Sequence, residues 1–167
     1  MSVYLVIPLL TVVALLQTTL LADVNLWGGR PDLMFLVVLI WTVVRGGSEG
    51  LLWAFIGGLL TDLLSGGPLG AMVLALLAVA VLSGQPWGQG IGSPVVRLVL
   101  TTFVAALLYH LVLLSVLAWT GFPVGWGWAI PKVALPSALL NSILAPFVRQ
   151  PLKWLEQRTR PERRLPL

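Results

Sequence analysis

The chain has 167 residues, of which 58% are hydrophobic and 10% are charged. Soluble domains carry about 25% charged residues, so this composition excludes a water-soluble globular protein and indicates a single polytopic membrane domain. Cysteine is absent, which excludes disulfides, thiolate metal sites and cysteine nucleophiles. The net charge of +4 does not indicate nucleic acid, because six of the ten basic residues lie from Arg149 onward and fit a cytoplasmic anchor facing anionic lipid.

Six apolar segments, separated by turns rich in Gly and Pro, predict six membrane-spanning helices. Their approximate ranges are 3–21, 33–44, 50–64, 69–83, 98–120 and 130–148. The first segment lacks the basic start of a secretory signal, so we expect it to be retained. The predicted fold is an all-α membrane protein, a bundle of six transmembrane helices over residues 1–148.

Residues 149–167 are predicted to form a basic cytoplasmic tail, in which 151–158 is a short interfacial helix. Six spans place both termini on one side of the membrane. When that side is the cytoplasm, eight basic residues lie inside and only Arg30 and Lys132 lie outside, as the positive-inside rule requires. We therefore predict a multi-pass protein with both termini cytoplasmic.

The eight tryptophans fall near predicted span ends or in loops, as an aromatic belt would place them. Those expected at the outer boundary are Trp27, Trp119, Trp126 and Trp128, and those expected toward the inner boundary are Trp41, Trp53, Trp87 and Trp154. Ordinary packing is the alternative for some of them.

Two aspartates stand beside apolar runs, Asp32 at the start of the second span and Asp62 near the end of the third. An acid at membrane depth is costly and marks a functional-site hypothesis. The short loop at 45–49 makes these spans antiparallel neighbours, so both acids are expected at similar depth near the outer boundary. Arg30 is the obvious counter-charge, because a guanidinium can bridge two carboxylates. We predict a structural polar cluster of Arg30, Asp32 and Asp62, which Gln17 can join.

Two other interpretations of this cluster stay open: a surface that contacts a partner protein, and a proton relay or cation site used in transport or catalysis. Two acids with no matching acid elsewhere are few for a pump, which favours the structural interpretation. His110 and Asn141 lie in the middle of the fifth and sixth spans, where they can hydrogen-bond each other.

The third span carries small residues at four-residue spacing, namely Gly50, Ala54 and Gly58. Such a stripe lets another helix approach closely. It is a candidate for helix packing within the bundle or for contact with a partner helix. Together with Asp62 on the same helix, it predicts that the third span is central and tightly packed.

Motifs for catalysis are missing. The sequence offers no Ser/His/Asp set, no phosphate-binding loop and no His-Glu-x-x-His, and its one histidine cannot make a metal cluster. We expect no enzyme activity, no cofactor, no metal and no nucleic-acid partner.

The order of the motifs resembles the MreD family, the rod-shape-determining integral membrane proteins of bacteria. The matching elements are Gln17 near the end of the first span, Arg30-Pro31-Asp32-Leu33, Gly46…Glu49-Gly50, Gly57-Gly58-Leu59-Leu60-Thr61-Asp62-Leu63-Leu64 and Pro68-Leu69-Gly70. The resemblance is carried mainly by the first half of the chain, and the Trp-rich stretch at 125–128 has no counterpart in the family pattern.

The resemblance implies a non-enzymatic scaffold or regulator of the elongation complex in the bacterial cytoplasmic membrane, which controls cell shape and peptidoglycan synthesis. It implies direct binding to MreC, with MreB, RodA and a class B penicillin-binding protein in the wider complex. It also implies a compact bundle like the substrate-binding subunits of energy-coupling-factor transporters. The rival function is therefore the substrate-binding subunit of a vitamin transporter, which would need a polar, aromatic-lined outer cavity.

Overall fold

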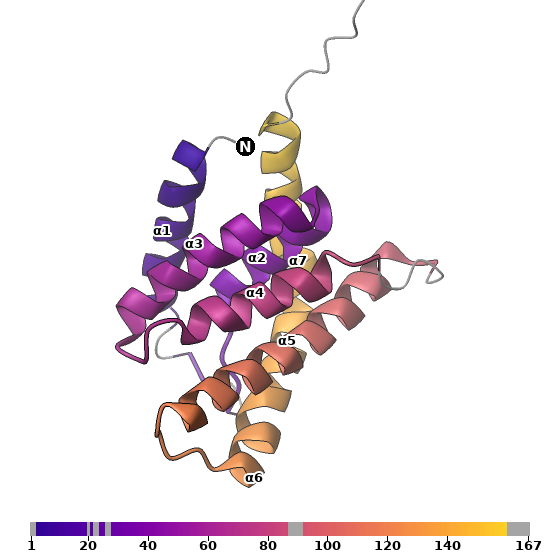
Figure 1. The fold of residues 1–167 in the computed structure, drawn as a ribbon. Coiled ribbons are helices and arrows are strands. Elements are labelled where there is room, and N and C mark those ends of the chain that lie inside the picture. The colour runs from indigo at the N-terminus through magenta and orange to yellow at the C-terminus, as the bar shows by residue number, and fades with distance from the viewer. Residues whose placement is uncertain (1–2, 20, 22–23, 26–27, 87–91, 160–167) are drawn as a thin grey trace, which may run out of the picture.

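A computed structural model describes residues 3–19, 21, 24–25, 28–86 and 92–159 (Figure 1). Helices make up the structure, and no strand occurs in these ranges. In chain order they are α1 (Val3–Thr19), α2 (Leu33–Arg45), α3 (Gly47–Ser65), α4 (Ala71–Ser83), α5 (Pro94–Trp119), α6 (Trp126–Ala129), the π-helical turn η1 (Ile130–Ala134) and α7 (Leu135–Thr159). The end of the bundle where α2 and α4 begin is termed the outer end, and the end where α3 and α5 begin is termed the inner end.

Helix α2 is the centre of the bundle. It packs against α1, α3, α4, α5 and α7, and every residue from Met34 to Thr42 is buried. A helix surrounded on all sides has no polar face, which explains the continuous apolar run. Its 13 residues span only about 20 Å, and the short length is tolerated because protein surrounds it. The prediction that the third span is the central one was therefore wrong, since one face of α3 is exposed.

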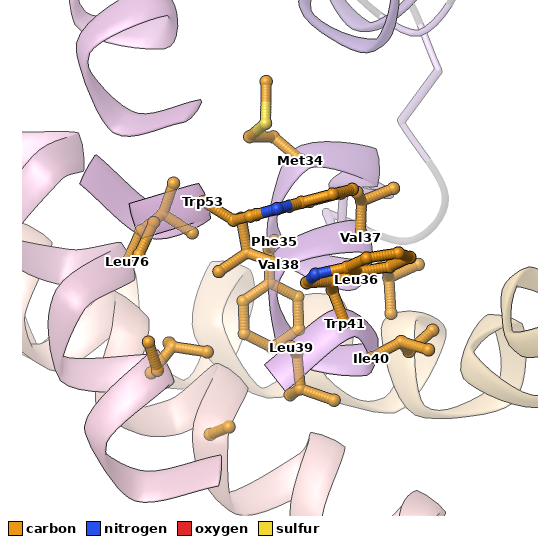
Figure 2. Close-up of a cluster of buried hydrophobic side chains, with 14 of the residues drawn as sticks. Met34, Phe35, Leu36, Val37, Val38, Leu39, Ile40, Trp41, Trp53 and Leu76 are labelled. Carbon is orange, nitrogen blue, oxygen red and sulfur yellow. The ribbon is translucent and has the colours of Figure 1, made fainter. Parts of the chain in front are cut away.

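The core around α2 contains two stacked tryptophans (Figure 2). The rings of Trp41 and Trp53 lie parallel, with centroids 4.1 Å apart, and both side chains are buried. These two residues are core residues and not part of a belt, which corrects the prediction for them. Trp119 is 91% exposed, and Trp126, Trp128 and Trp154 are exposed as well. Trp27 and Trp87 lie outside the described residues.

Small residues on α3 let its neighbours approach. A Cβ atom on Gly58 would lie 2.5 Å from the Val73 Cα on α4, and one on Gly50 would meet the side chain of Thr42 on α2. Ala54, the middle residue of the stripe, is fully buried. The stripe is thus covered by helices of the same chain, and the surface open to a partner must lie elsewhere.

Two helical stretches are long and apolar enough to cross a membrane: α5, with 26 residues, and the continuous stretch Trp126–Thr159, with 34. The apolar stretches Val6–Thr19, Leu33–Arg45 and Ala71–Ser83 are shorter. The all-helical class is confirmed, whereas six crossings of the membrane remain a prediction. Figure 1 draws the start of α1 and the end of α7 at the same end of the molecule.

Helix α7 continues through Pro146 and Pro151 to Thr159, so residues 151–158 are its last turns and not a separate helix. Leu152 and Glu156 on these turns are buried, which means that one side of the segment packs on protein and not on a membrane surface. Residues 160–167 lie outside the described residues, and the assignment of 149–167 as a cytoplasmic tail stays a prediction.

Candidate functional site

Polar side chains cap the start of α2 at the outer end. Asp32 has an extended backbone, and its Oδ1 accepts a hydrogen bond from the Phe35 N–H at 2.9 Å. Gln17, on α1, reaches across so that its Oε1 accepts from the Met34 N–H at 2.9 Å. The first backbone N–H groups of a helix have no partner within it, and a side-chain oxygen is the usual substitute. Gln17 therefore meets the start of α2, as its predicted place in a polar cluster implied.

The segment before α2 is fixed to α7 by hydrogen bonds to its backbone. The Asp32 N–H donates to Asn141 Oδ1 at 2.9 Å, and the Arg30 N–H donates to Ser137 Oγ at 3.1 Å. Asn141 is 1% exposed, and its Nδ2 also donates to the Arg30 carbonyl at 3.4 Å. Gly29 permits this contact, because a Cβ there would lie 2.7 Å from the backbone of Pro136.

Asn141 has a role that its position in the sequence did not reveal. Its expected partner, His110, instead contacts the Ala106 carbonyl through Nδ1 at 2.8 Å. The only sequence signal for this role was an asparagine in the middle of a span. Its hydrogen bond to the Asp32 N–H joins residues 109 positions apart in the chain, so the partner could not be read from the sequence.

Asp62 caps a second helix, α4, from the neighbouring α3. Its side chain is buried, with 2% exposure, and accepts three backbone hydrogen bonds. Oδ2 accepts from the N–H groups of Gly70 at 2.9 Å and Val73 at 3.2 Å, and Oδ1 accepts from the Met72 N–H at 2.9 Å. The N–H of Ala71 donates to the Pro68 carbonyl, so the whole first turn of α4 is satisfied.

The predicted guanidinium bridge is not formed. The Arg30 side chain is exposed, and in the described ranges no ion pair joins it to Asp32 or Asp62. The physical reason is that backbone N–H groups at helix starts occupy the carboxylate oxygens, and the positive end of the helix dipole takes the place of a cation. The acids nevertheless share a neighbourhood, because Tyr109 lies within electrostatic range of both and donates to Met72 Sδ at 3.0 Å.

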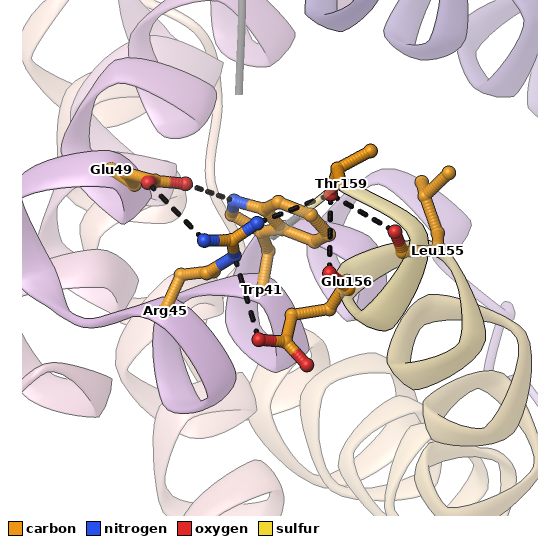
Figure 3. Close-up of polar contacts among 6 residues, drawn as sticks. All are labelled: Trp41, Arg45, Glu49, Leu155, Glu156 and Thr159. Atoms are coloured by element: carbon orange, nitrogen blue, oxygen red, sulfur yellow. Dashed lines mark hydrogen bonds and ion pairs between the residues drawn. The ribbon is translucent and has the colours of Figure 1, made fainter. Parts of the chain in front are cut away.

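A second polar cluster, at the inner end, centres on Arg45 (Figure 3). Its guanidinium lies 3.9 Å from Glu156 and 4.0 Å from Glu49, and it donates to Thr159 Oγ1 at 3.1 Å. Trp41 donates from Nε1 to Glu49 at 3.2 Å. The cluster joins the end of α2 to α3 and to the last turns of α7. The four-residue spacing of Arg45 and Glu49 was its only sequence signal.

The outer end also carries a pocket of about 670 Å³. It is lined by Asn25, Gly28, Arg30, Trp128, Pro131, Lys132 and Val133. Of the outer tryptophans in the described ranges, Trp128 is the one that lines it. Arg30 and Lys132 make the pocket cationic.

These features define the class of the protein: an apolar, all-helical membrane-type bundle in which the buried Asp62 and the half-buried Asp32 cap helix starts. Within the described residues, no group of three or more His, Cys, Asp or Glu side chains is arranged to hold a metal ion. Both oxygens of Asp62 accept backbone hydrogen bonds, so the geometry supports capping and not proton transfer.

The family follows from comparison with known proteins. The family described as rod shape-determining protein MreD matches residues 1–154, and the chain belongs to the MreD family. The family is one of bacterial membrane proteins with a role in rod-shape determination. No curated protein and no solved structure matched the chain.

Proposed function

We propose that the protein is a non-enzymatic scaffold or regulator of the rod-shape complex in the bacterial cytoplasmic membrane, with both termini cytoplasmic. In this proposal it binds MreC directly and acts with MreB, RodA and a class B penicillin-binding protein through the wider complex. One observation carries the structural role: Asp32 and Asp62, the acids at the outer end, are used as helix caps. Both oxygens of Asp62 and the Oδ1 of Asp32 accept backbone hydrogen bonds, which supports a rigid bundle over a carrier of protons or cations.

The partner contact is assigned to the outer pocket. Arg30 and Lys132 both line it, and neither forms an ion pair with a carboxylate in the described part of the chain. An acidic residue of MreC next to its membrane-spanning helix would supply the missing counter-charges. The bundle then acts as a fixed support, because the backbone beside Arg30 is held by Ser137 and Asn141.

Two sets of variants test this proposal by co-purification of MreC from native membranes. The double variant Arg30→Gln with Lys132→Gln is expected to lose MreC while keeping its thermal stability, and Lys153→Gln, an exposed cation at the opposite end, is the matched control. Full retention of MreC by the double variant would reject the pocket as the contact.

Variants of Asp32 and Asp62 test whether the helix caps are needed for the scaffold. Asp32→Asn combined with Asp62→Asn is expected to weaken the bundle and the MreC complex together, because both caps are reduced. Complete retention of the MreC complex would show that the caps are not essential to the scaffold.

The rival function is a substrate-binding subunit of an energy-coupling-factor vitamin transporter, and one observation favours it. The outer pocket combines a tryptophan, Trp128, with two cations and has the volume of a small-molecule site. Co-purification of a paired ATPase module instead of MreC would support this alternative over the scaffold.

A further inference from the structure

A second cavity lies at the inner end, away from the outer pocket and the caps. It has a volume of about 230 Å³ and lies where α2 and α4 end, where α5 begins, and beside α7. Two arginines line it, Arg97 from α5 and Arg149 from α7. None of the described residues that line it carries a carboxylate. The cavity is therefore strongly cationic.

Arg149 is incompletely satisfied. Its Nε is buried and has no hydrogen-bond partner among the residues that the structure describes. An unpaired buried donor costs about 1–3 kcal/mol, so such a group signals a missing acceptor. The described acids of the inner end, Glu49 and Glu156, are engaged with Arg45, and neither lines the cavity. Among the described residues no carboxylate forms an ion pair with Arg149, and a bound anion can supply the acceptor.

The start of α5 strengthens the attraction for an anion. Pro94, the first residue of this 26-residue helix, lines the same cavity. The free N–H groups and the helix dipole at such a start favour negative charge. Thr42 and Ser83 also line the cavity, but their hydroxyls donate to helix carbonyls. Gln85 and Thr101 add neutral donor groups to the lining, and the two arginines are its charged donors.

The size of the cavity and the residues around it favour a lipid headgroup over a soluble anion as its ligand. Ligand sites for drug-sized molecules have volumes of about 300–1,000 Å³, so this cavity fits a smaller group such as phosphate. Val43, which is 37% exposed, forms part of its lining. Val95, Val96 and Leu100 do not line the cavity, but they are exposed on the first turns of α5, the helix that carries Arg97, and these four apolar residues are termed the apolar rim. A soluble anion gains nothing from such a rim, whereas acyl chains can lie on it.

We propose that this cavity binds the phosphate of an anionic phospholipid, with Arg97 and Arg149 as its ligands and the acyl chains along the apolar rim. Guanidinium groups suit phosphate because they donate two parallel hydrogen bonds. The site lies beyond the proposed scaffold function and does not depend on it. It would fix the inner end of α5 and α7 to the lipid headgroup layer.

Native mass spectrometry of the full chain tests the site. The delipidated protein is titrated with phosphatidylglycerol, with phosphatidylcholine and with inorganic phosphate. Wild type is expected to retain phosphatidylglycerol at least about tenfold more tightly than Arg97→Gln combined with Arg149→Gln. Arg158→Gln, which removes an exposed arginine of the same helix, is the matched control and is expected to bind like wild type.

Three results would overturn the proposal. The first is a loss of phosphatidylglycerol in Arg158→Gln as large as in the double variant. The second is equal binding of phosphatidylcholine and phosphatidylglycerol by wild type. The third is displacement of the lipid by millimolar inorganic phosphate, which would assign the cavity to a free anion. If the double variant fails to fold, Arg97→Gln alone is used, because Arg97 makes no ion pair in the described residues. The affinity of this single variant for phosphatidylglycerol is expected to fall about tenfold, and an unchanged affinity would also reject the site.

Discussion

Replacement of Asp62 by alanine is the sharpest test of the capping arrangement. The side chain accepts hydrogen bonds from the N–H groups of Gly70, Met72 and Val73, and it is buried. Loss of an ordinary N-cap costs about 0.5–2 kcal/mol, and a hydrogen bond to a charged group contributes about 1.5–3 kcal/mol. Because three donors, two part-buried and one buried, lose their acceptor at once, we expect Asp62→Ala to lower the free energy of unfolding by about 3–5 kcal/mol.

Asp62→Asn should have a smaller effect. Asparagine keeps one acceptor oxygen but replaces the other by an NH₂ group, which cannot accept from a backbone N–H. We expect a loss of about 1–2 kcal/mol. The exposed neighbour Leu63 provides the control, and Leu63→Ala should stay within about 0.5 kcal/mol of wild type.

The assay is thermal unfolding in detergent micelles, followed by the fluorescence of the stacked Trp41 and Trp53. For a chain of this size about 1 kcal/mol corresponds to about 2–4 °C, so Asp62→Ala should lower Tm by about 6–20 °C. Hydrogen exchange at the start of α4 should accelerate in parallel, because its N–H groups lose protection. The reasoning is refuted if Asp62→Ala unfolds within 2 °C of Leu63→Ala.

Three further predictions use the same unfolding assay. Asn141→Leu leaves the part-buried N–H of Asp32 without its acceptor and should cost about 1–3 kcal/mol; a neutral result would mean that water replaces the amide. Gly58→Leu forces a side chain against the backbone of α4 and should cost about 1–3 kcal/mol, whereas unchanged stability would show that the two helices can separate freely. Arg45→Leu removes the cation that lies 3.9 Å from the buried Glu156 and should cost about 3 kcal/mol, and Arg45→Leu with Glu156→Leu should recover part of the loss; a double variant no more stable than the single one would contradict a specific pairing.

Much of the architecture was predictable because apolar runs and turn residues act locally. The predicted segment 33–44 matches α2 (Leu33–Arg45), and the predicted segment 69–83 contains α4 (Ala71–Ser83). The shared neighbourhood of the two acids followed from the short connection between α2 and α3. These inferences depend on residues close in the chain, where periodicity and turn chemistry are informative.

The partners of the acids were harder to predict, because they are set by contacts over long sequence separations. Arg30 is two residues from Asp32 and was the nearest cation, but the carboxylate caps a helix and the guanidinium points elsewhere. An aspartate directly before an apolar run is itself an N-cap signal, so the role of Asp32 was available from the sequence. The cap from Asp62 to α4 required the turn geometry at Pro68–Gly70, which composition does not specify.

The same limit applies to the tryptophans and to the centre of the bundle. A tryptophan near a span end suits a membrane interface and a protein core equally well, and only tertiary packing places Trp41 and Trp53 against each other. The small stripe on α3 correctly indicates close approach, but it does not say which helix approaches. In this chain the approaching helices are α2 and α4, and α2 takes the central place.

The short helices explain why acids are placed in this apolar chain. Helices α2 and α4 have 13 residues each, about 20 Å, whereas a hydrocarbon core is about 30 Å thick. In the predicted six-span arrangement, at least one end of each helix lies inside the membrane, where water cannot satisfy the first backbone N–H groups. Asp32 and Asp62 supply the acceptors at those ends. A group committed in this way cannot release its donors without unwinding a helix start. Loss of either acid should therefore weaken the bundle and, in the proposed function, the binding of MreC together, whereas loss of a relay would leave the bundle intact.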